Sequence, residues 1–198
     1  MRLSIRVDST CYETAMAGPV PTDVPNTPGV DYSRPDVWRL EGARRFFHRS
    51  TRCLTEEDST FSPGPKCFTV AEQIQHTADA VDFLIRGAFI EKKYDVNFDA
   101  DVTNPDAHRV KSKKEALENF DKAITWAMQL VSKMSDDELS APVPNTPLMP
   151  PWYTLRDILL LVIDHTAHHR GALTAYSRML GRSPNIPYYE SDSLKERV

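Results

Sequence analysis

Four helix-start signals, each followed by an apolar stripe, constrain the fold of this chain more than any other feature. In a capping box, a hydroxyl accepts a hydrogen bond from a free N–H group of the first helical turn. An acidic side chain three residues later accepts one from the N–H of the capping residue. The signals are Ser33-Arg-Pro-Asp36, Thr69-Val-Ala-Glu72, Ser112-Lys-Lys-Glu115 and Thr154-Leu-Arg-Asp157. They predict four helices, and Ser135-Asp-Asp-Glu138 predicts a short helical turn after the third.

Apolar residues recur behind each signal at the spacing of a helix bundle. The four stripes are Leu40, Ala43, Phe47 and Leu54; Val70, Ile74, Val81, Leu84 and Ile85; Leu117, Phe120, Ile124, Ala127, Val131 and Met134; and Leu155, Ile158, Val162, Ala172, Tyr176 and Met179. Narrow stripes on several helices indicate helices that pack on one another at a shallow crossing angle. Gly181 followed by Pro184 predicts the end of the last helix. We therefore predict an all-α protein, with a four-helix bundle at residues 33–198.

Residues 1–32 are predicted to form an irregular, proline-rich N-terminal extension. They contain Pro19, Pro21, Pro25 and Pro28, which remove backbone donors and fix φ. Residues 2–7 alternate in polarity and are consistent with one short strand. We treat residues 1–32 and residues 33–198 as the two parts of the chain.

Composition narrows the classes of partner and location. The net charge is −4 with both signs interspersed, which gives no nucleic-acid footprint. No apolar run approaches the ~20 residues that span a bilayer, and the N-terminus lacks an apolar signal region. We expect a cytoplasmic protein without nucleic-acid or membrane partners. Cys11, Cys53 and Cys67 are an odd set; Cys53 and Cys67 flank one loop, so a bridge between them and reduced thiols are both open.

His165 and His169 interrupt the inward-facing stripe of the fourth segment. They are four residues apart, so they share one helix face at a Cβ separation of about 6 Å. His168 falls outside that stripe and is expected to be exposed. Two buried imidazoles need partners. One divalent metal ion would serve both, since imidazole suits zinc, nickel, copper or iron(II); hydrogen bonds to backbone or tyrosine are the alternative.

His76 is the candidate third ligand. On a helical wheel it lies nearly opposite Ile74, on a side shared with Ala80 and Phe83. That side is either a second buried face or plain surface, and periodicity does not choose between them. Glu72 and Asp79 flank this side and are candidate acceptors for a ligand imidazole.

Several segments together resemble the DinB/YfiT superfamily. They are Phe68-Thr-Val-Ala-Glu-Gln-Ile-Gln-His76, Ser135-Asp-Asp-Glu-Leu139, Asp164-His-Thr-Ala-His-His-Arg-Gly-Ala-Leu173 and Leu180-Gly-Arg-Ser-Pro184. The resemblance runs from about residue 33 to 188. It implies an up-down-down-up bundle, a homodimer, and a divalent metal ion (zinc or nickel) bound at His76, His165 and His169. The chain departs from the family pattern at Ala172, where a glutamine usually follows Arg-Gly.

The resemblance also implies a reaction. Characterised relatives include thiol-dependent transferases and isomerases, so we expect a metal-activated thiolate from a low-molecular-weight thiol to act on a small electrophile. Arg170, Arg178 or Arg182 are candidates for holding an anionic cofactor, or are ordinary surface arginines. Metal-dependent hydrolysis is the alternative, with Asp79 or Asp164 as general base. A non-catalytic, metal-stabilised, stress-related bundle is the third reading.

Two further features carry weaker signals. Asp95-Val-Asn-Phe-Asp-Ala-Asp101 is similar to the start of a calcium loop, but Ala100 replaces the glycine and Asp106 the closing glutamate, so we interpret it as a solvated acidic loop. Trp152 and Tyr153 precede the last helix; they either line the mouth of the site or pack at the core or rim.

Overall fold

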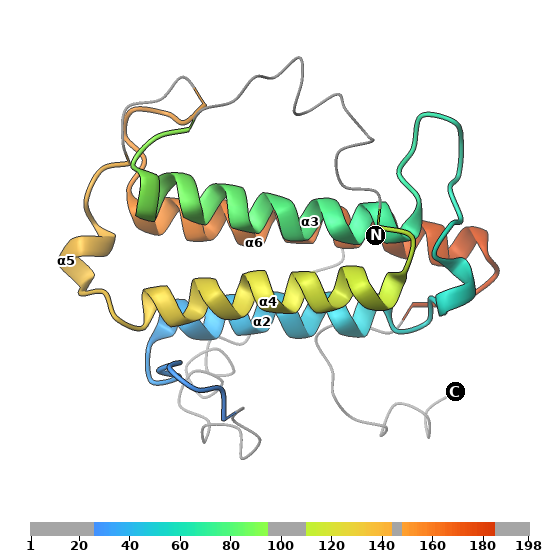
Figure 1. The fold of residues 1–198 in the computed structure, drawn as a ribbon, viewed down its shortest axis with the longest axis horizontal. Coiled ribbons are helices and arrows are strands. Elements are labelled where there is room, and N and C mark those ends of the chain that lie inside the picture. The colour runs from blue at the N-terminus through green and yellow to red at the C-terminus, as the bar shows by residue number, and fades with distance from the viewer. Residues whose placement is uncertain (1–25, 95–109, 144–147, 185–198) are drawn as a thin grey trace, which may run out of the picture.

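The structure, a computed structural model, describes residues 26–94, 110–143 and 148–184. Within these ranges the long helices are α2 (Pro35–Thr51), α3 (Val70–Ile85), α4 (Lys113–Val131) and α6 (Leu155–Met179) (Figure 1). Shorter turns are η1 (Glu56–Asp58), the π-helical η2 (Arg86–Glu91) and α5 (Asp136–Leu139). No named strand occurs in the described ranges; Pro142 and Thr154 form one isolated bridge. The predicted all-α class is confirmed.

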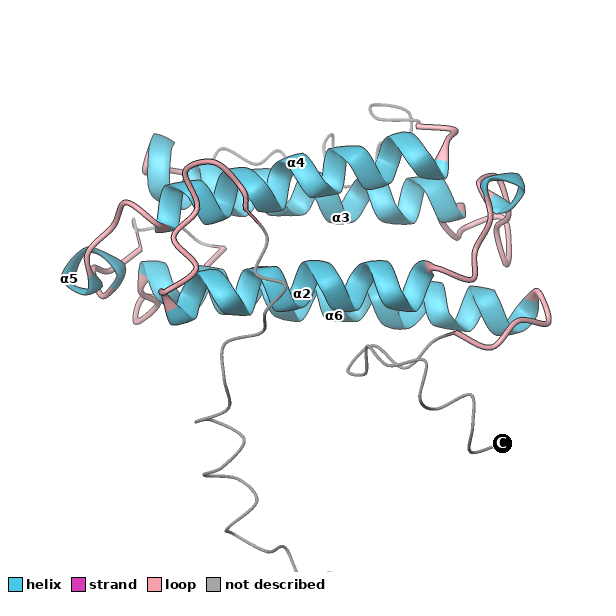
Figure 2. Ribbon diagram, turned by 90° about the horizontal axis from the view of Figure 1, so that it is seen from below, coloured by secondary structure: helices cyan, strands magenta, loops and turns pink. Residues whose placement is uncertain are grey.

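The four long helices form two layers. Figure 2 shows α3 beside α4 in one layer and α2 beside α6 in the other, and contacts also join α3 to α6 and α2 to α4. In Figure 1 the chain runs one way along α2 and α6 and the opposite way along α3 and α4. This is the up-down-down-up order that the family resemblance implies, and it makes α3 and α6 antiparallel neighbours.

Aromatic and aliphatic side chains fill the space between the layers. The rings of Phe47 on α2 and Phe120 on α4 lie 4.5 Å apart at their centroids, and both side chains are fully buried. Leu40, Ile74 and Ile158 are also completely buried. The stripes predicted for the first three helices therefore do face the core, with Leu117 and Met134 at its margin.

The stripe predicted for the last helix is confirmed at Leu155, Ile158, Val162 and Tyr176, and is wrong at Ala172 and Met179. Met179 is 61% exposed and Ala172 only half-buried, whereas Leu173 and Ser177 are fully buried. A straight α-helix rotates by about 20° per heptad relative to a strict seven-residue repeat. Over the length of α6 this drift carries the row that contains Ala172 and Met179 off the core face.

Helix capping follows the prediction at most of the predicted helix starts. Thr69 with Glu72 and Thr154 with Asp157 form complete capping boxes, as does Ser135 with Glu138 at α5. The hydroxyl of Ser112 accepts from the N–H of Glu115 at 3.1 Å. These hydrogen bonds cap the starts of α3, α4, α5 and α6.

The first start signal is misplaced. The N-cap of α2 is Arg34, not Ser33, and the Ser33 hydroxyl donates instead to Asp31 Oδ1 at 2.7 Å. Pro35 occupies the first helical position, where its fixed φ is favourable and its missing N–H costs nothing. The proline thus sets the cap one residue later than the hydroxyl pattern indicates.

The described end of the N-terminal extension lies against α4. The backbone N–H of Asp31 donates to Ser132 Oγ at 2.8 Å, and Gln129 Nε2 donates to the carbonyl of Pro28 at 2.8 Å. The strand predicted at residues 2–7 and the acidic segment at residues 95–101 lie outside the described residues. Cys53 and Cys67 are free thiols.

Among the described residues, none of the helices combines the length and the apolar character that crossing a membrane requires.

Candidate metal centre

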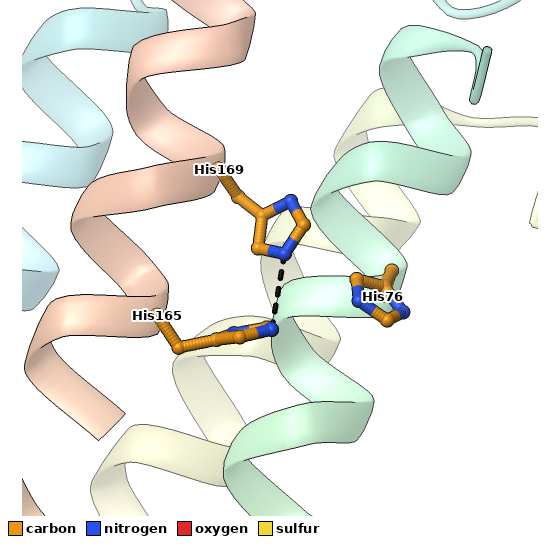
Figure 3. Close-up of side chains that lie close together, drawn as sticks. All are labelled: His76, His165 and His169. Atoms are coloured by element: carbon orange, nitrogen blue, oxygen red, sulfur yellow. Dashed lines mark hydrogen bonds between the residues drawn. The ribbon is translucent and has the colours of Figure 1, made fainter. Parts of the chain in front are cut away.

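Three imidazoles from two helices converge on one point. His76 projects from α3, and His165 and His169 project from α6 toward it (Figure 3). One ring nitrogen of each lies within 4.8 Å of the others. The Nε2 atoms of His165 and His169 are 3.0 Å apart, and the ring of His76 lies 4.7 Å from that of His169 at the centroids.

The antiparallel packing of α3 on α6 explains why His76 reaches the cluster. Helix α3 packs against two of the other long helices, α4 and α6, so it has two buried faces: the side of Ile74 enters the core and the side of His76 turns toward α6. This settles the ambiguity on the helical wheel. Towards the C-terminal end of α3 the same side is exposed to solvent, as the 39% exposure of Phe83 shows. Phe68, just before α3, stacks on the His76 ring at 5.1 Å.

The surroundings of the cluster keep all three imidazoles neutral. Burial, with the neighbouring histidines adding to it, lowers the pKa of His165 to about 4 and that of His169 to about 3. Burial also lowers the pKa of His76, although the charge of Asp79 opposes this. Neutral imidazoles offer free lone pairs, which is the state that a metal ligand needs.

Gln73 is the polar residue that sequence reasoning missed. It is buried on α3, and its side-chain amide hydrogen-bonds His169 Nδ1. The proposed acceptors act elsewhere: Glu72 caps α3, and Asp79 accepts from Gln75 Nε2 at 2.7 Å. Spacing from His76 could not reveal this role, because Gln73 serves a ligand on the other helix.

The donor set fits a divalent metal ion. Three imidazoles with an open fourth position are a common ligand set for zinc, and nickel accepts the same donors. Two nitrogens bound to one tetrahedral zinc ion at 2.0–2.1 Å lie about 3.3 Å apart, close to the 3.0 Å between His165 and His169. His165 Nδ1 is buried without a hydrogen-bond partner in the described part of the chain. The ring is therefore held by packing and by its Nε2 side, which faces the cluster.

The other candidate residues named from the sequence are not members of this cluster. Asp79 acts on His76 through its charge, while Asp164 and His168 are exposed on α6. Arg170 reaches toward α2, where its guanidinium lies 5.6 Å from the centre of the Phe46 ring.

The C-terminal arginines have local partners. Arg178 donates to the carbonyl of Thr174 at 3.1 Å, and Arg182 pairs with Asp58. Trp152 is 76% exposed, so it is not packed in the core. It precedes α6, whereas His165 lies about 16 Å along that helix at 1.5 Å per residue, so Trp152 is also remote from the cluster.

Fold and site together define a class: a four-helix bundle with a three-histidine cluster between two antiparallel helices. The DinB superfamily matches residues 39–173, and the chain belongs to this superfamily. A search among curated proteins finds no match.

Solved structures share the fold. A DinB-like protein from Bacillus cereus ATCC 10987 is 20% identical with a TM-score of 0.57, and the match covers 78% of this chain and 95% of that one. A DinB-like protein from Bacillus subtilis is 14% identical with a TM-score of 0.57, and that match covers 80% and 99% of the two chains.

Proposed function

We propose that this protein binds one divalent metal ion, zinc or nickel, through His76, His165 and His169. The convergence of three ring nitrogens within 4.8 Å carries this proposal. When bound, the ion would supply a Lewis acid that lowers the pKa of a thiol or a water molecule at the open position.

Thiol-dependent transfer or isomerisation is the activity that we favour. The three ligands are neutral, so they leave the charge of a divalent ion uncompensated, which favours an anionic partner such as a thiolate. The metal-ligand cluster found among the described residues contains no carboxylate. A thiol cofactor brings its own nucleophile and needs only binding and desolvation from the protein. Characterised members of the superfamily with this chemistry support the same choice.

Hydrolysis has less support from the described residues. It requires a general base that is free to take a proton from water. Asp79 is engaged by Gln75, and Asp164 points from an exposed position on α6. The small electrophile that we propose as substrate would instead approach beside the stacked rings of Phe68 and His76.

Two measurements test the proposal in sequence. Elemental analysis of protein purified without added metal, beside a His165→Ala variant, is expected to give one zinc or nickel ion per chain in the parent and none in the variant. The metal-loaded protein is then assayed with 1-chloro-2,4-dinitrobenzene and maleate, with and without glutathione or cysteine. Turnover only with a thiol supports the proposed chemistry. Equal turnover without thiol, or ester hydrolysis that Asp79→Ala abolishes, would exclude it.

A further inference from the structure

Gln73 and His169 form a contact between the two helices that carry the metal ligands. Gln73 is 5% exposed and lies three residues before His76 on α3, yet its amide meets Nδ1 of His169 on α6. Its backbone carbonyl accepts from the hydroxyl of Thr77 at 2.8 Å, and its side chain reaches the cluster through the contact with His169. Burying an amide costs free energy unless the amide is hydrogen-bonded, and His169 is the partner of this one.

The geometry points to a role for Gln73: we propose that it fixes the orientation of the His169 ring so that Nε2 faces the metal, and that its amide can pair with Nδ1 in either tautomer. This inference rests on the proposed metal site. A neutral imidazole carries one proton, and the nitrogen that bears it cannot bind a metal. If Gln73 Oε1 accepts from Nδ1–H, the lone pair is placed on Nε2, the atom that already lies 3.0 Å from His165 Nε2.

An amide suits this position because it can serve both tautomers of its partner. Without metal, the amide N–H of Gln73 donates to Nδ1 of His169. His169 then donates its Nε2–H to His165 Nε2, and His165 carries its own proton on Nδ1. If a metal ion took Nε2, His169 would carry its single proton on Nδ1 instead, so no net proton would be released. A half-turn of the amide would then present Oε1 to that Nδ1–H.

The two ligands on α6 differ in this respect. His165 Nδ1 is buried without a hydrogen-bond partner in the described part of the chain, so no side-chain hydrogen bond there holds that edge of its ring. His169 is therefore the ligand whose orientation is set in advance, and Gln73 is the positioning residue that sets it. Loss of such a partner of a metal-bound histidine typically weakens metal binding 10–100-fold.

The test compares Gln73→Leu with Gln73→Glu, and uses Gln75→Leu as the matched control. Gln75 is also buried on α3, but it contacts Asp79 and Asn119 rather than a histidine. Zinc dissociation constants are measured by competition with a chromophoric chelator. We expect Gln73→Leu to bind zinc 10–100-fold more weakly than the parent. Gln73→Glu keeps an acceptor for Nδ1–H, so its affinity is expected to equal or exceed that of the parent. Gln75→Leu should bind zinc as tightly as the parent, since it leaves the His169 contact intact.

Nitrogen NMR of the histidine rings supplies a readout that a merely structural role would not move. In the zinc-bound parent, His169 is expected as the Nδ1–H tautomer. In the metal-free parent, His169 Nδ1 is expected to carry no proton, because the Gln73 amide donates to it. Metal-free Gln73→Leu should lose this preference for an unprotonated Nδ1. Unchanged zinc affinity in Gln73→Leu, or equal weakening in Gln73→Leu and Gln73→Glu, would overturn the inference while the metal site stands. A parent protein that binds no zinc or nickel would overturn the proposed function itself.

Discussion

The metal-free protein should lose stability steeply between pH 7 and pH 5, because two buried imidazoles resist protonation. Their pKa values in the folded chain are about 4 for His165 and about 3 for His169, against about 6.5 in an unfolded chain. Between these values the unfolded chain binds more protons than the folded one, so stability falls as the pH falls. Above about pH 6.5 the contribution of both groups is fully present.

The size of the effect follows from the same values. For each imidazole, the free energy of unfolding drops by about 2 kcal/mol from pH 7 to pH 5, so the pair accounts for about 4 kcal/mol. That is a large share of the roughly 5–15 kcal/mol by which folded domains are stable. The lowered pKa of His76 acts in the same direction.

Urea denaturation in metal-depleted buffer at pH 7, 6 and 5 measures this loss. The control is the double variant His165→Leu/His169→Leu, which keeps every other titrating group of the chain. Its loss over this range should be smaller than that of the parent by about 4 kcal/mol. Removal of the hydrogen bond between Gln73 and His169 changes the stability of the variant equally at each pH. Parallel pH profiles for the two proteins would refute the reasoning.

The remaining predictions concern metal affinity, the core, a tight contact and a helix cap. Three imidazoles of ordinary pKa would lose about 600-fold in zinc affinity from pH 7 to pH 5.5, because protons compete with the metal. The lowered pKa values of this cluster should make the loss in the folded protein far smaller, and zinc titrations at both pH values measure it. Phe120→Ala removes a fully buried ring against Phe47 and should cost about 3–5 kcal/mol in urea denaturation; a cost below 1 kcal/mol would contradict the packing. Gly87→Ala would place a Cβ in steric conflict with the Tyr94 ring, so we expect a lower melting temperature, whereas an unchanged melting temperature would contradict this close contact. Thr69→Ala should cost about 1 kcal/mol through loss of the α3 cap, by the same denaturation measurement.

Local chemistry made much of the fold predictable from the sequence. The capping boxes at Thr69 and Thr154 depend only on residues three positions apart, so their pattern translates directly into structure. The prediction that Ser33 caps the first helix was wrong because Pro35 imposes a stronger constraint on the same turn. The prediction that Met179 faces the core was wrong because a fixed heptad row drifts around a long straight helix.

The candidate site depends on how helices pair, which the sequence shows less directly. The spacing of His165 and His169 places both on one face whatever the tertiary fold. His76 became interpretable only through family resemblance, because its side of α3 is buried by α6 rather than by the apolar core. Gln73 gave no signal at all, since a polar residue near the start of a helix is ordinary, and its partner lies on a helix far along the chain.

The order of the helices along the chain has a consequence for how an ion at this cluster would act on folding. Its ligands sit at residues 76, 165 and 169, so an ion that took all three would tie together the two ends of the segment that contains α4 and α5. Closing so long a loop in the unfolded chain is entropically expensive, and a clip that holds it closed removes that freedom. Binding of the ion would thus require the whole bundle to be folded rather than any one pair of helices. Removing the ion would lower the stability of both layers, because α3 belongs to one and α6 to the other.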